Sequence, residues 1–160
     1  MKKGQKRIGE ILIKNGLITE AQLHDALLTQ KLSDGFIGTV LINKGVIDKR
    51  QLLEALSEQF DIPLVDLKTQ YVDIELGRKF SSSLMLDHGC FPLRQDEDSV
   101  TVAITNPLNA VAISKVEEEV SPRKVNWVLV SEDDLKELMQ NYRQGISRNI
   151  QKLLKKDKKE

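Results

Sequence analysis

Residues 7–30 and 36–59 are two copies of one segment. The first copy reads RIGEILIKNGLITEAQLHDALLTQ, the second reads FIGTVLINKGVIDKRQLLEALSEQ, and the spacer KLSDG separates them. The copies are identical at 11 of 24 aligned positions, whereas unrelated segments of this length would share about one or two residues. The duplication requires the same local structure in both copies, so this part of the chain must fold as an arrangement of two like units.

Each copy has the spacing of a helical hairpin. Apolar residues recur at helical spacing from Ile8 up to Gly16, which stands where a C′ glycine ends a helix. Thr19 and Gln22 then form a capping-box pair that opens a second helix. One face of that helix carries Leu23, Ala26, Leu27 and Gln30. We therefore predict four helices and no strand within residues 7–59.

The chain after Phe60 has a mixed pattern of short strands and helices. Pro63 ends the preceding helix, residues 64–67 are extended, and short helices are expected at 72–80 and 84–88. Strands are predicted at 91–94, 99–104 (SVTVAI) and 125–130 (VNWVLV), with helices at 108–120 and from Ser131 to Tyr142. The fold class is therefore α+β, with a tandem helix-hairpin repeat followed by a small α/β subdomain with a short sheet and a C-terminal helix. The predicted bounds are 1–60, 61–144 and 145–160.

Residues 145–160 are basic and amphipathic. Apolar positions such as Ile150 and Leu153 alternate with Arg148, Lys152 and Lys155. One interpretation is a tail or linker, or a solvated extension of the preceding helix. The other is a helix that binds a partner or a membrane surface.

Composition excludes several classes of protein. The 24 basic and 24 acidic residues balance, so no global field favours nucleic acid. The single cysteine, Cys90, excludes an intramolecular disulfide. There is no signal-peptide pattern and no apolar run near the roughly 20 residues that cross a bilayer. We expect a cytoplasmic protein that does not span the membrane.

Catalytic and metal-binding patterns are weak. No phosphate-binding G-x-x-x-x-G-K-[ST] loop occurs, and no nucleophile is paired with a base. Asp87, His88 and Cys90 lie close together, but a metal site needs a second ligand pair, and a turn with a buried cysteine explains them as well. We predict no enzyme activity, no metal and no cofactor.

The repeat has the spacing of a known motif. Its first copy presents arginine, an apolar residue, glycine, leucine, glycine, two leucines and glutamine at Arg7, Ile8, Gly9, Leu12, Gly16, Leu23, Leu27 and Gln30. This order resembles the MshEN motif, which is duplicated with a five-residue spacer in N-terminal domains of GspE/PilB/MshE-type ATPases of type II secretion and type IV pilus assembly. Residues 60–67, 91–93 and 102–107 resemble later stretches of the same domain. The resemblance covers residues 7–142.

The resemblance implies a regulatory module that binds cyclic di-GMP across the two motifs, as some of these domains do. The implied partners also include a secretion or pilus assembly ATPase or an inner-membrane platform protein, with a peripheral position at the inner membrane as an option. The ligand-binding residues carried over from the motif are Arg7, Ile8, Gly9, Leu12, Leu23, Leu27, Gln30, Phe36, Ile37, Gly38, Leu41, Leu52, Leu56, Gln59 and Asn106.

The residue types fit a nucleotide, and each has a structural alternative. Arg7 can stack on a guanine or hydrogen-bond to it, or be a solvated arginine. Gly9 and Gly38 can let a phosphate approach the backbone, or let helices pack closely. The leucines can contact bases or fill the core. Gln30 and its equivalent can bond a ligand or neighbouring backbone.

Two positions depart from the family pattern. Phe36 stands where the second motif commonly begins with a basic residue, and Asn106 stands where an aspartate is often found. Phenylalanine can stack on a base but cannot donate a hydrogen bond. These departures keep a second hypothesis open, in which the domain docks proteins of a secretion or pilus system and binds no nucleotide.

Overall fold

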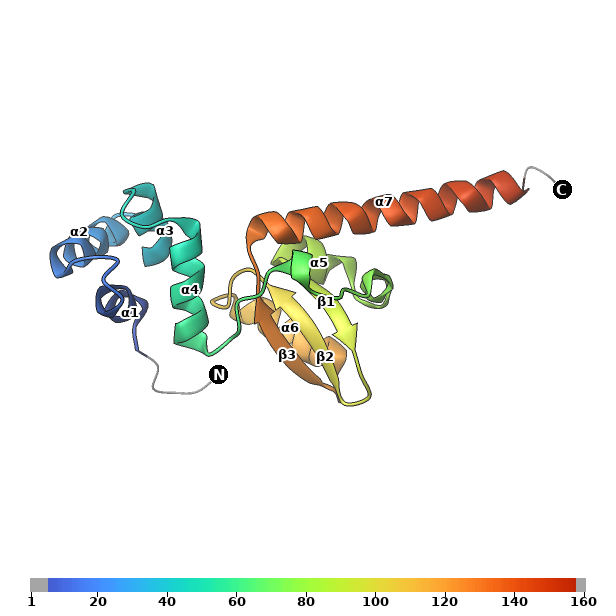
Figure 1. Ribbon diagram of the computed structural model, residues 1–160, viewed down its shortest axis with the longest axis horizontal. Coiled ribbons are helices and arrows are strands. Elements are labelled where there is room, and N and C mark those ends of the chain that lie inside the picture. The colour runs from blue at the N-terminus through green and yellow to red at the C-terminus, as the bar shows by residue number, and fades with distance from the viewer. Residues whose placement is uncertain (1–5, 158–160) are drawn as a thin grey trace. The chain divides into compact units, whose positions relative to one another are not determined.

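The computed structural model describes residues 6–157. The chain divides into two compact units, Met1–Leu64 and Val65–Glu160, and each unit is described by itself below (Figure 1). The first unit is helical, and the second combines a three-stranded sheet with helices. The predicted α+β class is confirmed.

The repeat unit contains four helices and no strand between residues 7 and 59, as predicted. The first copy forms α1 (Ile8–Lys14) and α2 (Glu20–Lys31), and the second forms α3 (Ile37–Asn43) and α4 (Lys49–Phe60). The equivalent helices have equal lengths, 7 residues for α1 and α3 and 12 residues for α2 and α4. The two copies therefore form two matching helical hairpins.

The residues predicted to end and begin these helices do so in both copies. Gly16 and Gly45 have positive φ values of 71° and 70°, which glycine adopts without a steric penalty. Beyond Gly16, the Leu17 amide donates to the Leu12 carbonyl at 2.9 Å, the bond that defines a Schellman ending. At the start of α2, the Gln22 amide donates to Thr19 Oγ1 at 3.1 Å, and the Thr19 amide donates to Gln22 Oε1 at 2.8 Å. Asp48 and Gln51 make the same reciprocal pair before α4.

Each helix of one copy packs against a helix of the other copy. Helix α1 packs against α4, and α2 packs against α3. Exchanging the copies converts one of these pairs into the other, so the unit has an approximate two-fold relation between its halves. The core shares this relation, because its eight buried residues form four equivalent pairs: Ile11/Val40, Leu12/Leu41, Ile18/Ile47 and Ala26/Ala55.

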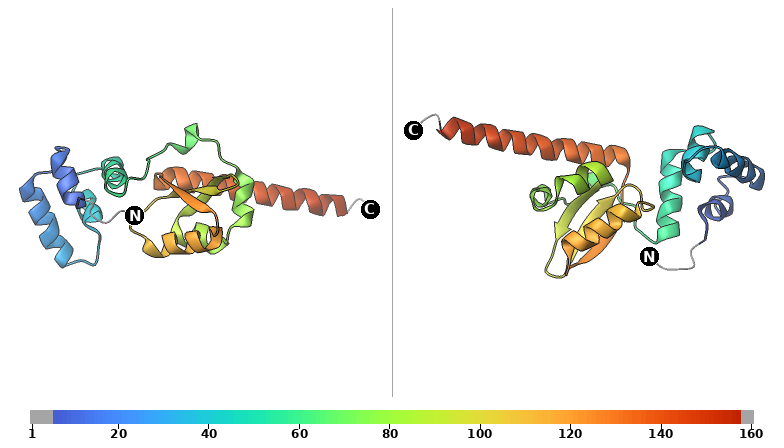
Figure 2. Two further views of the ribbon diagram at one scale, coloured as in Figure 1. Left: turned by 90° about the horizontal axis from the view of Figure 1, so that it is seen from below. Right: turned by 180° about the vertical axis from the view of Figure 1, so that it is seen from behind.

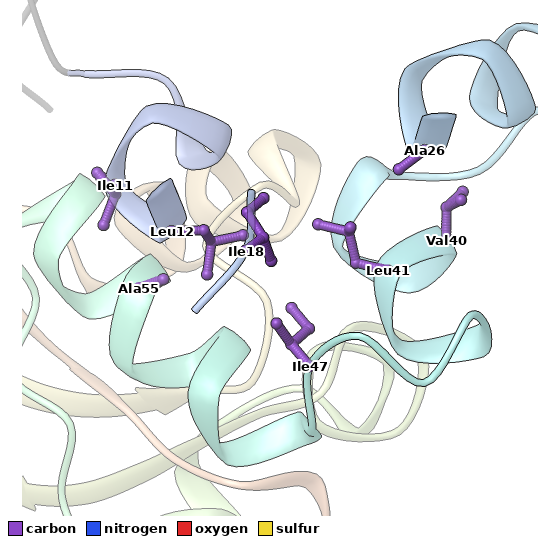
Figure 3. Packing of buried hydrophobic residues seen from close by; sticks show 8 residues of the cluster. All are labelled: Ile11, Leu12, Ile18, Ala26, Val40, Leu41, Ile47 and Ala55. Atoms are coloured by element: carbon purple, nitrogen blue, oxygen red, sulfur yellow. The ribbon is translucent and has the colours of Figure 1, made fainter. Parts of the chain in front are cut away.

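Figure 3 shows how this core is arranged. Ile11 and Ala55 lie at one end, and Ala26 and Val40 lie at the other. Leu12, Leu41 and the two equivalent isoleucines fill the space between them. Each half of the core therefore draws on both copies, and neither hairpin can bury these side chains alone.

A glycine in the first turn of α1 and of α3 brings a leucine close. A Cβ atom built on Gly9 would lie 2.7 Å from Leu23 Cδ1, and one built on Gly38 would lie 2.6 Å from Leu52 Cδ1. Side-chain carbons do not normally approach so closely. Of the two explanations left open by the sequence, close packing is the one that the structure shows for both glycines.

The second unit is built on a sheet in the order β1-β2-β3, formed by Cys90–Gln95, Ser99–Ile104 and Lys124–Leu129. Strands β1 and β2 are antiparallel, and β2 and β3 are parallel, with α6 (Ala110–Val120) as their crossover. Short helices η1 (Leu67–Thr69), η2 (Ile74–Lys79) and α5 (Ser82–His88) precede the sheet. Figure 2 shows the sheet between α6 and the first half of α7, and both faces of β2 are accordingly buried.

Helix α7 spans Glu132–Asp157. The sequence left two forms open for residues 145–160, a tail or linker or a solvated extension of the preceding helix, and the structure continues one helix to Asp157. Residues 143–156 are mostly good helix formers such as Gln, Arg, Lys and Leu, and one interior glycine costs only about 1 kcal/mol. Among the described residues, no helix is both long enough and apolar enough to cross a bilayer.

We expect Gly38→Ala to lower the free energy of unfolding by about 1–3 kcal/mol, because the new methyl group collides with Leu52. Gly145→Ala is the matched control. No atom lies within 4 Å of its added Cβ, so it should stabilise the protein by about 0.5–1 kcal/mol. Urea unfolding followed by circular dichroism measures both, and an unchanged midpoint for Gly38→Ala would contradict the packing argument.

Cys90 should be unreactive while the protein is folded. Its side chain is 2% exposed, and burial raises the thiol pKa from 9.0 to about 12. The fold therefore favours the neutral thiol, and this contribution to stability is present below pH 9 and lost as the pH rises toward 12. Alkylation at pH 8 should be slow until denaturant is added, and Cys90→Ala should lose less stability than the unmodified protein above pH 9. Rapid alkylation of the folded protein would show that the strand opens easily.

Candidate functional site

The candidate site consists of the residues that head α1 and α3. Arg7 has φ and ψ of −67° and 147°, and Phe36 has −72° and 144°, so the two backbones share one conformation. Both side chains are exposed, Phe36 by 55%. The two copies thus present different side chains, a guanidinium and a phenyl ring, from equivalent backbones.

The first turns also differ in what satisfies their amide groups. The Arg7 amide donates to Glu10 Oε2 at 3.1 Å. Thr39 occupies the position equivalent to Glu10, and Phe36 makes no side-chain cap bond. The first copy therefore carries an arginine and a glutamate at its head, and the second carries neither.

The implied contact leucines fall into two groups. Leu12 and Leu41 are fully buried and belong to the core. Ile8, Ile37, Leu23 and Leu52 are partly buried and pack against that core. Their predicted contact with a ligand stays a prediction, and the packing gives each of these side chains a structural role in addition.

Leu27 and Leu56 are equivalent in sequence but not in exposure. Leu27 is 42% exposed and Leu56 only 7%. Leu28, near the end of the first copy, and Leu32, in the spacer, are 49% and 91% exposed. The end of the first copy and the spacer therefore expose more large apolar side chains than the end of the second copy does.

Gln30 has a backbone partner. Its Nε2 donates to the Gly35 carbonyl at 3.0 Å, which satisfies the partly buried amide. Gly35 directly precedes Phe36, so the last residue of the first copy fixes the start of the second. Gln59, the equivalent residue, is partly buried.

Two ties across the copies were not predicted from the sequence. Glu58 on α4 accepts from Lys14 Nζ at 3.2 Å and from Asn15 Nδ2 at 3.1 Å. Lys44 Nζ donates to Asp25 on α2 at 2.8 Å. Asn15 and Lys44 are equivalent residues that directly follow α1 and α3, and each contacts a carboxylate of the other copy. Their equivalence in the duplicated sequence is the signal from which such a pair of contacts could have been predicted.

The contacts of Glu58 with Lys14 and Asn15 also affect the charge state of its carboxyl group. The hydrogen bonds from Asn15 and Lys14 stabilise the carboxylate, and they hold the pKa of Glu58 below its ordinary value. The carboxylate therefore keeps its charge, and its tie to α1, as the pH falls toward that lowered pKa. Because the group is exposed, salt screens this contribution.

Asn106 lies in the α/β unit, before α6. Its Oδ1 accepts from the Leu108 amide at 3.0 Å and so shapes the turn that follows β2. Asn109 then caps α6 by accepting from the Ala112 amide at 3.0 Å. Asn106 is therefore a turn residue, and its predicted contact with a ligand stays a prediction.

The clustered Asp87, His88 and Cys90 have contacts other than a metal. Asp87 Oδ2 accepts from Ser83 Oγ at 2.9 Å, and His88 Nε2 lies 3.2 Å from Lys115 Nζ. Within residues 6–157, no three His, Cys, Asp or Glu side chains are grouped as a metal site would require. The Cys90 thiol lies 3.6 Å from the His88 carbonyl and is buried in β1.

Comparison with curated proteins identifies ATPases of pilus assembly. The chain is 28% identical over 117 residues to the type IV pilus assembly ATPase PilB of Thermus thermophilus, an alignment that covers 72% of this chain and 13% of that protein. It is 27% identical over 136 residues to PilB of Myxococcus xanthus, which covers 85% of this chain and 24% of that protein. The chain thus spans less than a quarter of the length of these relatives.

Solved structures share the fold. A structure of MshE with cdg, cyclic di-GMP, has a TM-score of 0.81 and 26% identity and covers 86% of this chain and 99% of that one. The N-terminal domain of XpsE, at 16% identity, has a TM-score of 0.62 over 88% of this chain and 97% of that one. Because residues 60–160 make up less of the chain than the MshE match covers, that match includes part of the repeat.

The family assignment rests on the second unit more than on the repeat. The family model of the MshEN domain matches residues 60–149, which is more than half of the chain and begins after the second motif. The relatives and the solved structures agree with it. The resemblance first seen in the duplicated motif is confirmed, and the chain belongs to the MshEN domain family.

Proposed function

We propose that this chain is a non-catalytic regulatory module that binds cyclic di-GMP across its two motifs, within an apparatus for pilus assembly or type II secretion. The observation that carries the proposal is the reciprocal packing of the copies. It relates the heads of α1 and α3 by an approximate two-fold axis. Cyclic di-GMP has two-fold symmetry as well, with two guanines and two phosphates. The likeness to MshE with cdg supports the same ligand.

The two half-sites would contribute different chemistry. Arg7 is exposed and offers a planar cation that can stack on a guanine or donate paired hydrogen bonds to it. Phe36 offers an exposed ring that can stack on a base. It adds no charge to oppose a phosphate. The Arg7 half-site would therefore contribute most of the polar binding energy.

A ligand held by both motifs would act on the arrangement of the copies. It binds best when the two heads are held as the core holds them, so it would favour that arrangement over any in which α1 separates from α4. The shift equals the difference in affinity for the two arrangements and no more. In a larger ATPase, such a shift would reach the rest of the protein through the domain.

A second candidate function has its own supporting observation. Phe36 is accompanied by exposed leucines at 28 and 32, close to it in the sequence. Exposed apolar side chains of this kind suit contact with a protein partner, for example another component of the apparatus. In this case the domain is a docking adaptor, and Phe36 is a contact residue for a protein.

Calorimetric titration with cyclic di-GMP separates the two functions. The nucleotide function expects saturable heat with cyclic di-GMP and none with GTP or cyclic di-AMP at the same concentrations. It also expects a rise in the melting temperature with ligand concentration, because the ligand binds only the folded state. If cyclic di-GMP at high concentration gives no heat and no thermal shift, that result favours the adaptor.

Variants at the two heads assign the half-sites. Arg7→Ala should weaken binding by about 1.5–3 kcal/mol, the range for a hydrogen bond to a charged group, with little change in stability. Arg50→Ala is the matched control, because Arg50 is an exposed arginine of the same unit that pairs only with Glu54 among the ion pairs of the described residues. It should leave binding unchanged.

Phe36→Arg is the sharpest test. It restores a basic residue to the second head, so it should tighten binding of cyclic di-GMP by adding attraction to phosphate. The adaptor function expects the opposite, with no nucleotide affinity and weaker binding of a protein partner. A Phe36→Arg protein with a normal melting temperature that still gives no heat with cyclic di-GMP would refute the sensor function for this chain.

A further inference from the structure

We propose that the C-terminal half of α7, residues 146–155, binds the surface of a membrane that contains anionic lipids. The segment belongs to the α/β unit and shares no residue with the proposed nucleotide site. The inference therefore stands independently of the proposed function. It rests on the exposure, spacing and charge of the residues in this half of the helix.

One apolar stripe runs along α7, and the described residues of its own unit cover only the first half of it. Leu135 is buried, and Leu138, Met139 and Tyr142 pack against the core of the α/β unit. The Tyr142 ring meets Phe91 edge-on, with ring centroids 5.4 Å apart. This half of the helix is therefore anchored to the sheet.

The stripe continues beyond that anchor into solvent. Ile146, Ile150, Leu153 and Leu154 follow at i, i+4, i+7 and i+8, which places them on one side of the helix. Ile150, Leu153 and Leu154 are 51%, 63% and 58% exposed. Figure 1 shows this part of α7 extending past the sheet of its own unit. An apolar face is thus presented on a rigid helix with no described element of its unit covering it.

A basic stripe lies on the other side of the same segment. Arg148, Lys152 and Lys155 are exposed, and each follows an apolar residue of the stripe by two positions, which is about 200° around the helix. No acidic residue occurs from 138 to 156, whereas Glu132, Asp133 and Asp134 begin the helix. The free half therefore combines an apolar face with positive charge.

A purely structural role explains only part of this pattern. Cations near the C-terminus of a helix interact favourably with its dipole, and this accounts for the lysines and for the acidic first turn. It does not account for three large aliphatic side chains gathered on one exposed face. A solvated helix extension needs no such face.

A second copy of the chain is a poor partner for this face. The first half of the stripe is already covered by the sheet, so a second copy could pair only with the free half. Pairing the apolar stripes of two copies would leave Arg148, Lys152 and Lys155 of both copies on the outside of the pair, so it would add positive charge and neutralise none of it. The positive charge requires a negatively charged partner.

An anionic lipid surface supplies both complementary features. The apolar stripe can enter the boundary between headgroups and acyl chains, as in interfacial helices. The long basic side chains can reach toward the headgroups. Because a helix is about 10 Å across and the Debye length is about 8 Å at physiological salt, the charges on the far side still feel the surface. The partner is therefore assigned as anionic lipid.

Co-sedimentation of the full chain with vesicles tests the assignment. The protein should bind vesicles of phosphatidylcholine with one-third phosphatidylglycerol at low salt, and bind much less to pure phosphatidylcholine or at 0.5 M salt. Lys152→Gln and Lys155→Gln should each weaken partitioning by about fivefold. Leu153→Asp should weaken it by at least about tenfold, because it removes an apolar anchor and adds a repelled charge.

Two matched controls locate the effect. Lys136→Gln removes an exposed lysine from the anchored half of α7, and Leu32→Ser removes a leucine that is 91% exposed in the other unit. Neither should change partitioning. Because the substituted side chains of the free half are exposed, circular dichroism and the melting temperature should be unchanged in every variant of that segment, so lost binding is not lost folding.

Three results would overturn the inference. The first is no sedimentation with anionic vesicles at low salt. The second is equal weakening by Lys136→Gln, which would make the attraction non-specific. The third is a concentration-dependent dimer in analytical ultracentrifugation that Leu153→Asp abolishes, which would assign the face to a second copy. Arg7→Ala should retain vesicle binding whether or not it binds nucleotide, so this inference and the proposed function fail separately.

Discussion

The repeat unit depends on the packing of α1 against α4 and of α2 against α3. A hairpin of 7 and 12 residues is too short to be stable alone in water. Packing of each helix against the other copy stabilises both hairpins, because Leu12 of one copy and Leu41 of the other become fully buried in one core. Replacing either leucine by alanine would cost roughly 2–5 kcal/mol. The ties from Lys14 and Asn15 to Glu58, and from Lys44 to Asp25, then hold the same two helix pairs at the surface.

The local structure of the repeat was predictable because each signal acts within a few residues. Gly16 ends a helix through its own positive φ, and Thr19 caps the next through an amide three residues away. The choice of helix partners was not predictable in the same way. A periodic apolar face says that a helix packs, but not which helix covers it. The extent of α7 was left open for a related reason, because Gly145 is a weak signal against a run of helix formers.

The candidate site was only partly accessible from the sequence. The motif gave the equivalence of Arg7 and Phe36, and the structure gives them the same backbone conformation. The structure also shows that the other motif positions have different structural roles. Gly9 and Gly38 admit leucines, Leu12 and Leu41 fill the core, and Gln30 holds the Gly35 carbonyl. Sequence reasoning could offer each role as an alternative but could not choose, because a buried side chain and a ligand contact require the same residue types.

This division of tasks has a consequence for how binding can diverge. The backbone at the head of each motif is fixed from inside the unit. The packing of glycine on leucine fixes the first turn, and Gln30 fixes the residue before Phe36. The side chain at the head is exposed and takes no part in that packing. An arginine or a phenylalanine can therefore occupy the same backbone without altering the fold. The chemistry offered to a ligand can change by one substitution while every contact that maintains the two-fold core stays in place. For the ligand proposed above, residues 7 and 36 are therefore the positions at which affinity could differ while the fold stays the same.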